Sequence, residues 1–361
     1  MTPGLAPRWA SPPGATIEAI MQERKLTIED LATQLHLGPR QMRGLLTGDI
    51  SIDVDRAAVL SKVLGGSSRF WLTREAEYCE DSIRILAADW SASLPLQHMQ
   101  DLGWMEPATH WREQIEECLR FFGVDDYEEW IQKYSHQTRR AHYRKTAAFP
   151  NDENATLVWF RAAEREFEKL LFAKEYSRDA IETRLGALRK LTRIRDPQVF
   201  VPKLQAECSG AGVAVVVVPT PRGCRASGAT RWINARPLIQ LSARHQSDDH
   251  FWFTLFHELG HVLCHGATSG DFIDLDGAER GVDVLEDEAD TFATRVILGE
   301  TTTIESVPHG DYRDVIREAA RLGVGPGLLA GQLQYHGLAA QDRLNGLKRR
   351  YRWIGTTLVS K

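Results

Sequence analysis

The stretch His257-Glu258-Leu259-Gly260-His261 lies between two apolar runs, residues 251–256 and 262–263. Histidines four residues apart share one face of a helix, because 3.6 residues make a turn. Their imidazoles can bind one zinc ion, and the glutamate between them can act as general base on a water at the open position. A helix that is apolar on nearly all sides belongs in a core, where unpaired polar groups are costly. The pattern therefore predicts a zinc site with His257 and His261 as ligands and Glu258 as the base.

A second acidic segment, Glu286-Asp287-Glu288-Ala289-Asp290, opens a downstream apolar segment and can supply the third ligand. Glu286 and Asp290 are four residues apart and share a helical face. We expect Glu286 to bind the metal and Asp290 to hydrogen-bond the free ring nitrogen of His257. Glu288 projects away from that face and is interpreted as a solvated charge. The alternative is an acidic first turn that only complements the helix dipole.

Further side chains near the motif leave two questions open. His265 follows His261 by four residues, one turn beyond the metal, and we expect it to support or pack against the ligands rather than bind the ion. A peptide-cleaving site also needs a donor for the tetrahedral oxyanion. The candidates are His265, Arg231 and a residue of the loop 266–285.

Composition is that of an ordinary globular protein, with 361 residues, 43% apolar and 26% charged. The net charge of −5 gives no overall attraction to nucleic acid. The five cysteines, without a Cys-x-x-Cys pair, favour a reducing compartment. Residues 1–15 lack the apolar core of a secretory signal, and the run 212–219 is too short to span a bilayer. A cytoplasmic location without membrane contact is expected.

The spacing of apolar residues and the positions of glycine and proline predict a mainly α protein with a small antiparallel β-sheet, which is an α+β class. Five short helices are expected in residues 16–78, and later helices at 111–122, 127–134, 155–172, 178–194, 315–322 and 338–351. Strands are expected at 213–218, 229–233 and 238–241, the last two joined by the turn 234–237. The predicted domains are a flexible tail (1–15), a helix-turn-helix domain (16–80), a helical connector (81–195), a zincin-like metallopeptidase core (196–300) and a C-terminal helical subdomain (301–361).

The strand 229–233 is expected at the sheet edge beside the metal helix. An exposed edge can pair with an extended peptide and lay its scissile bond over the metal. Substitution of Thr230 by proline would then remove a backbone donor from the cleft.

The N-terminal segment has a helix-turn-helix pattern. The stretch Thr27 to Asp30 predicts a capping box, Gly38 breaks the chain, and Pro39 suits the first residue of the next helix. Together with the ending Phe70-Trp71-Leu72, these features resemble the lambda-repressor/Cro-like (XRE) domains, and among them the HigA-type antitoxins.

The resemblance implies a recognition helix that offers Arg40, Gln41 and Arg43 to DNA. Residues 16–75 nevertheless carry eight basic and eight acidic side chains, whereas DNA binders usually show a basic footprint. A domain retained for dimerisation or partner docking is therefore the alternative, and a homodimer is compatible with it.

Residues 196–350 resemble the ImmA/IrrE family of zinc metallopeptidases. The resemblance rests on the valine strand, on Phe253-Thr254-Leu255 leading into His257 to His261 with His265 after it, and on Glu286 to Asp290 followed by Phe292-Ala293. Residues 296–300 depart from the Leu-Leu-Met-Pro-like run in which relatives commonly end this helix. The resemblance implies a zinc-dependent protease of narrow specificity that inactivates a repressor or antitoxin-like protein in stress or phage responses.

A second function stays open. The chain can be a DNA-binding transcriptional regulator or antitoxin whose metal domain is a non-catalytic sensor or partner-binding module. Glu258 argues against this alternative, because a purely structural zinc site needs a fourth protein ligand rather than a base aimed at an open position.

Overall fold

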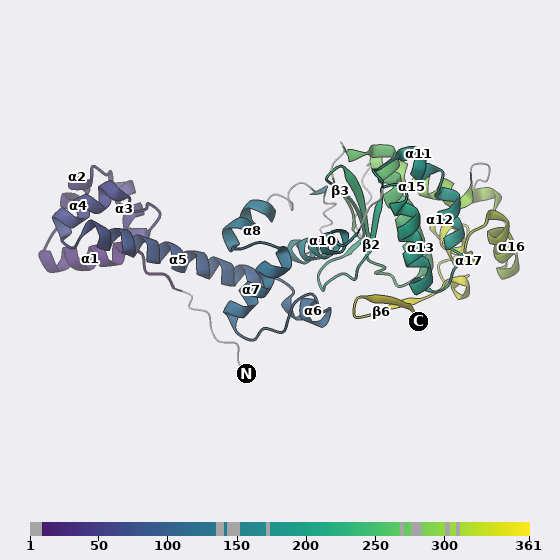
Figure 1. Ribbon diagram of the computed structural model, residues 1–361, viewed down its shortest axis with the longest axis horizontal. Coiled ribbons are helices and arrows are strands. Elements are labelled where there is room, and N and C mark those ends of the chain that lie inside the picture. Colours follow the sequence, from purple (N-terminus) through teal and green to yellow (C-terminus); the bar gives the residue numbers. More distant parts are fainter. Residues whose placement is uncertain are drawn as a thin grey trace. The chain divides into compact units, whose positions relative to one another are not determined.

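The computed structural model describes residues 9–134, 141–142, 152–170, 174–267, 271–275, 284–299, 304–307 and 311–361 (Figure 1). The chain divides into two compact units. The N-terminal unit comprises Met1–Ser93 and Pro107–Arg120, and the C-terminal unit comprises Leu94–Glu106 and Phe121–Lys361. Among the described residues, no helix has the length and apolar character needed to cross a bilayer.

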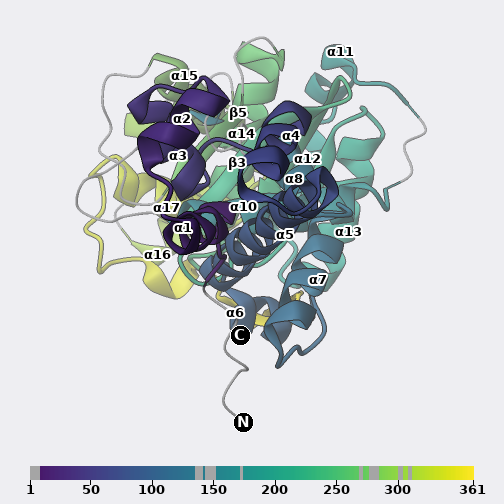
Figure 2. The ribbon, with the colours of Figure 1, turned by 90° about the vertical axis from the view of Figure 1, so that its left-hand side faces the viewer.

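Helices α1 to α4 of the N-terminal unit surround a small core (Figure 2). Their bounds, with that of α5, are α1 Pro13–Arg24, α2 Ile28–Leu35, α3 Pro39–Thr47, α4 Val54–Leu64 and α5 Ser68–Ser93. The predicted capping box is confirmed, since the Thr27 hydroxyl accepts from the Asp30 amide at 3.1 Å. Leu31, Leu45 and Trp71 lie in the core. Five helices are present as predicted, but α5 is 26 residues long rather than short.

The middle of the chain is helical, as predicted. Its elements are α6 Leu96–Asp101, α7 Trp111–Phe122, α8 Tyr127–Tyr134, α10 Glu153–Phe167, α11 Arg178–Glu182, α12 Leu185–Leu191 and α13 Pro197–Ser209. The single helix predicted for 178–194 is two short helices, α11 and α12.

A five-stranded sheet forms the centre of the C-terminal unit. Its strands are β1 Ala141–His142, β2 Ala214–Val217, β3 Ala226–Ile233, β4 Arg236–Leu241 and β5 Asp271–Leu275, in the order β1-β5-β3-β4-β2. The mainly α class with a small sheet is confirmed, but the sheet is mixed rather than antiparallel. The hairpin strand β4 lies between β3 and β2, so β2 runs parallel to β4, and β1 also pairs parallel with β5.

Both faces of this sheet are covered, with α10 on one side and α13 and α14 on the other (Figure 1). Two consecutive valines of β2 show that the sheet has two covered faces. Val215 packs in the core with α13 and α14, and Val216 packs on the other face with α10. A strand buried on both faces reads as a continuous apolar run rather than an alternating one.

Strand β3 is an interior strand, so the prediction that residues 229–233 form a sheet edge is wrong. Thr230 pairs with Ile239 of β4 on one side and with Phe272 of β5 on the other. Ala229 and Thr230 therefore lie between two ladders, where a substrate strand cannot add, whereas residues 231–233 pair with β4 alone among the described registers. The sequence did not reveal this neighbour, because residues 271–275, which form β5, follow the metal-motif helix and carry no clear strand pattern.

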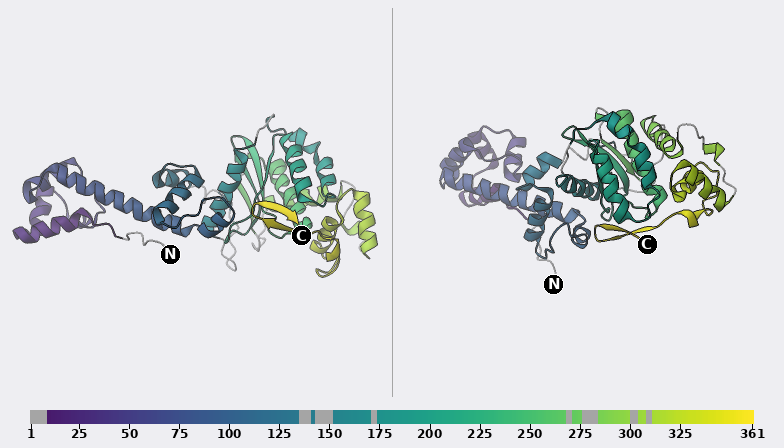
Figure 3. Two further views of the ribbon diagram at one scale, coloured as in Figure 1. Left: turned by 60° about the horizontal axis from the view of Figure 1, so that its bottom comes forward. Right: turned by 45° about the vertical axis from the view of Figure 1, so that its right-hand side comes forward.

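The metal-motif helix α14 Asp248–Gly260 continues into a π-helical turn, His261–His265, and packs against α15 Val284–Leu298. The remaining elements are η3 Ile304–Ser306, α16 Tyr312–Leu322, α17 Pro326–Tyr335, η4 Asn345–Leu347, β6 Tyr351–Ile354 and β7 Thr357–Ser360. The helix predicted at 338–351 is wrong. Gly337 and Leu344 have left-handed backbone conformations that end helices, and β6 and β7 form a hairpin (yellow in Figure 3).

Two buried carboxylates tie the start of α14 to the C-terminal segment. Asp249 Oδ2 lies 2.6 Å from Lys348 Nζ, and the Arg349 amide donates to Asp248 Oδ1 at 2.9 Å. Burial raises the pKa of Asp248 to about 6, with the neighbouring Asp249 charge adding to the effect and the contacts with Arg349 opposing it. Compared with the unfolded chain, the folded protein therefore favours the protonated form of Asp248.

The substitution Asp248→Asn should remove a pH-dependent loss of stability. The pKa of Asp248 is higher in the folded protein than in the unfolded chain. The stability that its protonated carboxyl contributes is therefore complete below pH 3.8 and is lost as pH rises through about 6. The variant should gain on the order of 1–3 kcal/mol over the wild type between pH 4 and pH 7. Urea denaturation across this range measures the difference, with the exposed Asp342→Asn as control. A difference that does not change with pH would contradict the assignment.

Candidate metal centre

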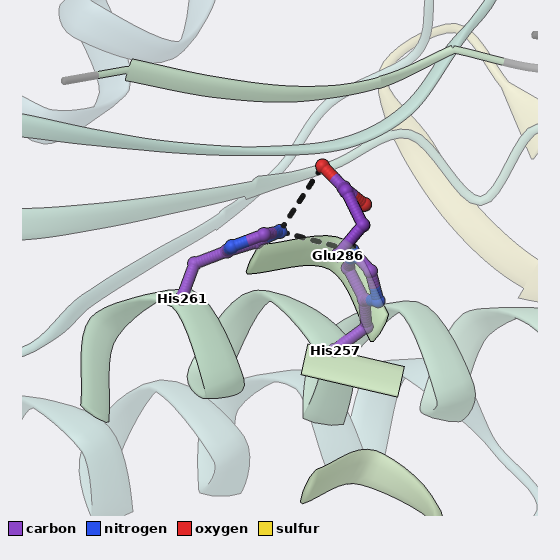
Figure 4. Close-up of side chains that lie close together, drawn as sticks. All are labelled: His257, His261 and Glu286. Carbon is purple, nitrogen blue, oxygen red and sulfur yellow. Dashed lines mark hydrogen bonds and ion pairs between the residues drawn. The ribbon is translucent and has the colours of Figure 1, made fainter. Parts of the chain in front are cut away.

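His257, His261 and Glu286 converge in the C-terminal unit (Figure 4). The two histidine Nε2 atoms are 3.0 Å apart, and Glu286 Oε2 lies 3.2 Å from His257 Nε2. Glu286 Oε1 lies 3.7 Å from His261 Nε2. Both imidazoles are buried. Two nitrogens and one carboxylate within 4.8 Å of one another form the donor set that suits a zinc ion with an open position.

The contact of α14 with α15 brings these side chains together. A Cβ atom on Gly260 would lie 2.9 Å from Ala289 Cα, closer than real Cβ atoms approach. Only glycine therefore permits this crossing. Glu286 is one turn before Ala289, which places its carboxylate against the histidines of α14.

Asp290 lies beside His257, where the sequence analysis expected it. Its Oδ1 atom is 2.8 Å from His257 Nδ1, which leaves Nε2 of that ring directed at Glu286. The Tyr335 hydroxyl at the end of α17 donates to the other oxygen, Oδ2, at 3.3 Å. A carboxylate in this position fixes the tautomer and orientation of a ligand histidine. Tyr335 was missed by the sequence analysis because α17 is remote in sequence and carries no metal-ligand pattern.

His261 is supported in a similar way from the other side. Its Nδ1 atom lies 3.0 Å from Nδ1 of His265, whose Nε2 atom lies 3.0 Å from Glu288 Oε2. With Nε2 of His261 directed at the metal position, Nδ1–H of His261 donates to Nδ1 of His265, and Nε2–H of His265 donates to the Glu288 carboxylate. The interpretation of Glu288 as merely solvated was incomplete, since its side chain is half exposed yet contacts His265.

Glu258 is fully buried between α14 and strand β3. The Thr230 hydroxyl donates to its Oε2 atom at 2.6 Å. A Cβ atom on Gly228 would lie 2.4 Å from its Oε1 atom, so glycine leaves the space that the carboxylate occupies. Residues 228 and 230 share one face of β3 because strand side chains alternate. This period of two was the available signal, but the sequence analysis considered only the backbone of Thr230.

Arg231 lies on the opposite face of β3 and does not reach the centre. Its guanidinium contacts Glu164 Oε1 at 2.8 Å and the Phe160 carbonyl at 3.1 Å, both on α10. It is therefore not an oxyanion donor. Of the loop 266–285, residues 268–270 and 276–283 lie outside the described residues. Within the described part, the Phe272 ring stacks on His261 with centroids 4.0 Å apart.

The three residues predicted to read DNA lie in the N-terminal unit, on α3. Arg40, Gln41 and Arg43 are exposed. Gln41 also has a structural contact, because its side-chain oxygen accepts from the Gly38 amide at 3.1 Å and caps the helix.

Comparison with protein-family models matches residues 213–333 to the IrrE N-terminal-like domain, the M78 peptidase family. The matched range runs from β2 to α17 and contains His257, Glu258, His261 and Glu286. It supports the resemblance of this part of the chain to the ImmA/IrrE peptidases. The match does not include the XRE-like segment. No curated protein matches the chain.

Zinc binding should depend on these residues in a defined order. We expect about one zinc per chain, abolished by His257→Ala or His261→Ala and strongly weakened by Glu286→Ala. Asp290→Asn and Glu288→Gln should each weaken zinc binding less, by roughly 100-fold at most, because these side chains contact a histidine rather than the metal. Competition with a chromophoric chelator measures the affinities, and the exposed Asp287→Asn on the same helix is the control. A loss for Glu288→Gln as large as that for Glu286→Ala would contradict the ligand set.

Proposed function

We propose that this chain is a zinc-dependent endopeptidase of narrow specificity that cleaves a repressor or antitoxin-like protein. The observation that carries the proposal is a buried carboxylate, Glu258, on the helix that contributes two of the three converging metal-ligand side chains. A structural zinc site has four protein ligands and needs no base. Hydrolysis needs both an open coordination position and a base, and three ligand side chains with Glu258 provide for both.

The ligand set fits zinc catalysis in number and type. In the part of the chain that the structure describes, the cluster has three members, His257, His261 and Glu286. Zinc, when bound, would activate a water and polarise the scissile carbonyl as a Lewis acid. Asp290 and His265 hold the two imidazoles in orientation, so little reorganisation is needed on binding.

Glu258 supplies the proton transfers in this mechanism. Its carboxylate accepts a proton from the attacking water and then delivers that proton to the leaving amine. Thr230 holds one carboxylate oxygen at 2.6 Å, and Gly228 keeps space beside the other. A fixed carboxylate in a buried site needs no rearrangement during the reaction.

The nature of the target rests on resemblance. The family match of residues 213–333 supports a peptidase of the ImmA/IrrE kind, and the XRE-like pattern in residues 16–80 supports a link to transcription or to a stress or phage-defence response. All five cysteines are free thiols, in keeping with a cytoplasmic location.

We further propose DNA as a partner of the N-terminal unit, with a homodimer as a compatible state. Helices α2 and α3 are joined by only three residues, His36 to Gly38, as in helix-turn-helix domains. Arg40 and Arg43 are exposed on α3. A DNA-binding regulator with a non-catalytic metal domain is the second candidate function, and this unit is the observation that favours it.

Cleavage decides between the two functions. When the chain is co-expressed with its genomic neighbours, one neighbour should be cut, and Glu258→Gln should abolish the cut while retaining zinc. Thr230→Val should lower the rate by roughly tenfold, because Glu258 loses its hydroxyl donor, and Thr230→Ser should restore most of it. Mass spectrometry of the neighbours detects the products. Equal processing by wild type and Glu258→Gln would reject the peptidase proposal.

DNA binding has an independent test. Arg40→Ala and Arg43→Ala should each cost on the order of 1–3 kcal/mol if the side chain reads a base edge. Lys62→Ala, an exposed position on α4, should change little. Gel shifts with the chain's own promoter at low salt measure the effect. Absence of any shift would assign the unit to dimerisation or partner docking.

A further inference from the structure

We infer that a cavity beside α6 binds a small molecule that carries a phosphate group. The cavity has a volume of about 520 Å³ and lies within the C-terminal unit. Its lining comes from α6, from the segment 220–224 between β2 and β3, and from Arg244, which follows β4. None of these residues belongs to the candidate metal centre, so this site is separate from the proposed peptidase function.

His98 and Arg222 both line the cavity and offer donor groups to a ligand. The Arg222 amide donates to His98 Nδ1 at 2.7 Å, so the neutral imidazole carries its proton on Nε2. Among the described residues, this Nε2 atom and the Arg222 guanidinium have no hydrogen-bond or ion-pair partner. Both groups can therefore bind an oxyanion without giving up another contact.

Arg244 brings a second guanidinium to the lining, from a strained and anchored loop. Ala243 and Gln246 on this loop have left-handed backbone conformations, with φ of 48° and 53°. This conformation is unfavourable for residues other than glycine. The Trp353 indole donates to the Ser242 carbonyl at 3.1 Å, and the Arg244 amide donates to the Ser242 hydroxyl at 3.2 Å. Strained backbone that the surrounding structure holds in place is typical of ligand sites.

The charged side chains of the lining favour an anion. Arg222 and Arg244 are opposed by one carboxylate, that of Asp101, whose Oδ1 accepts from the Gln97 amide at 2.9 Å. Burial raises the pKa of the Cys224 thiol to about 11, so this thiol is neutral near pH 7 and adds no negative charge. Two positive charges against one negative charge attract an anionic ligand.

A second carboxylate, that of Asp152, lies behind the lining at Gly223. Its Oδ1 atom caps α10 by accepting from the amides of Asn154 and Ala155, at 2.9 and 3.1 Å. The positive end of the helix dipole offsets this charge. Asp152 therefore opposes the two guanidiniums of the lining less than a free carboxylate would.

The donors of the cavity suit phosphate better than a carboxylate. A phosphate monoester has three terminal oxygens and roughly two negative charges near pH 7. Two guanidinium groups and one imidazole N–H match it in charge and in hydrogen-bonding capacity. The cavity is much larger than a phosphate group, and Gln97 and Thr220 add polar side chains to its lining. The chemical class of ligand is therefore a phosphate monoester with a polar body, such as a sugar phosphate.

Titration calorimetry on the zinc-loaded full-length protein tests this site with three probes: ribose 5-phosphate, inorganic phosphate and ribose. Ribose 5-phosphate should bind most tightly, and inorganic phosphate should bind roughly tenfold more weakly because it lacks the body. Ribose should give no binding heat at millimolar concentration. The affinity of ribose 5-phosphate should fall as salt is added, because charges at the protein surface are screened.

Two variants remove one donor each. Arg222→Ala changes an exposed side chain, and His98→Asn keeps an acceptor for the Arg222 amide while it removes the Nε2 donor. Each should weaken binding of ribose 5-phosphate by roughly tenfold, because a charge-assisted hydrogen bond is lost. Arg193→Ala removes an exposed arginine elsewhere in the C-terminal unit and is the control, with affinity within about twofold of the wild type.

A roughly tenfold loss in both variants, with the control unchanged, supports the site. Absence of binding heat with both phosphate probes would overturn it. Unchanged affinity in either variant would overturn it as well, because the phosphate would then be held elsewhere, for instance on the zinc. None of these results bears on the peptidase proposal, which depends on Glu258 and the candidate metal centre.

Discussion

The close approach of α14 and α15 at Gly260 and Ala289 is the contact on which the candidate centre depends. Any side chain at position 260 would collide with the backbone of α15, and separating the two helices would withdraw Glu286 from both histidines. Protein cores are packed densely enough that such a change is transmitted to neighbouring elements instead of being absorbed locally. The glycine inside the metal motif therefore has a purely steric function, distinct from the chemistry of the residues on either side of it.

The sheet is the second part of this arrangement, because strand β3 has a different function on each face. Gly228 and Thr230 face α14 and hold the Glu258 carboxylate. Arg231 faces α10, where its buried guanidinium forms an ion pair with the partly buried Glu164. This pairing offsets part of the cost of placing a guanidinium inside the protein. The strand thus supports Glu258, the proposed general base, from one face and anchors the helical layer behind the sheet from the other.

The two histidines of the candidate centre are each connected to a carboxylate, directly for His257 and through His265 for His261. Outer partners of this kind orient imidazoles and raise their basicity as ligands. The π-helical turn at His261–His265 lies at this point, and such turns are frequent at functional sites. Tyr335 joins the arrangement from α17, because its hydroxyl donates to Asp290, the carboxylate that contacts His257.

The sequence alone determined the features that depend on local spacing. Histidines at i and i+4, a glutamate and an aspartate four apart, and apolar periodicity identified α14, α15 and the residues that converge, because helical geometry fixes which side chains share a face. The sequence also indicated α7 and α8 and the capping box at Thr27. Tertiary structure decided which strand is interior, that β2 runs parallel to β4, and that Thr230, Tyr335 and Glu288 adjoin the centre. These contacts join residues distant along the chain, and their geometry comes from the packing of whole elements, which no local pattern encodes.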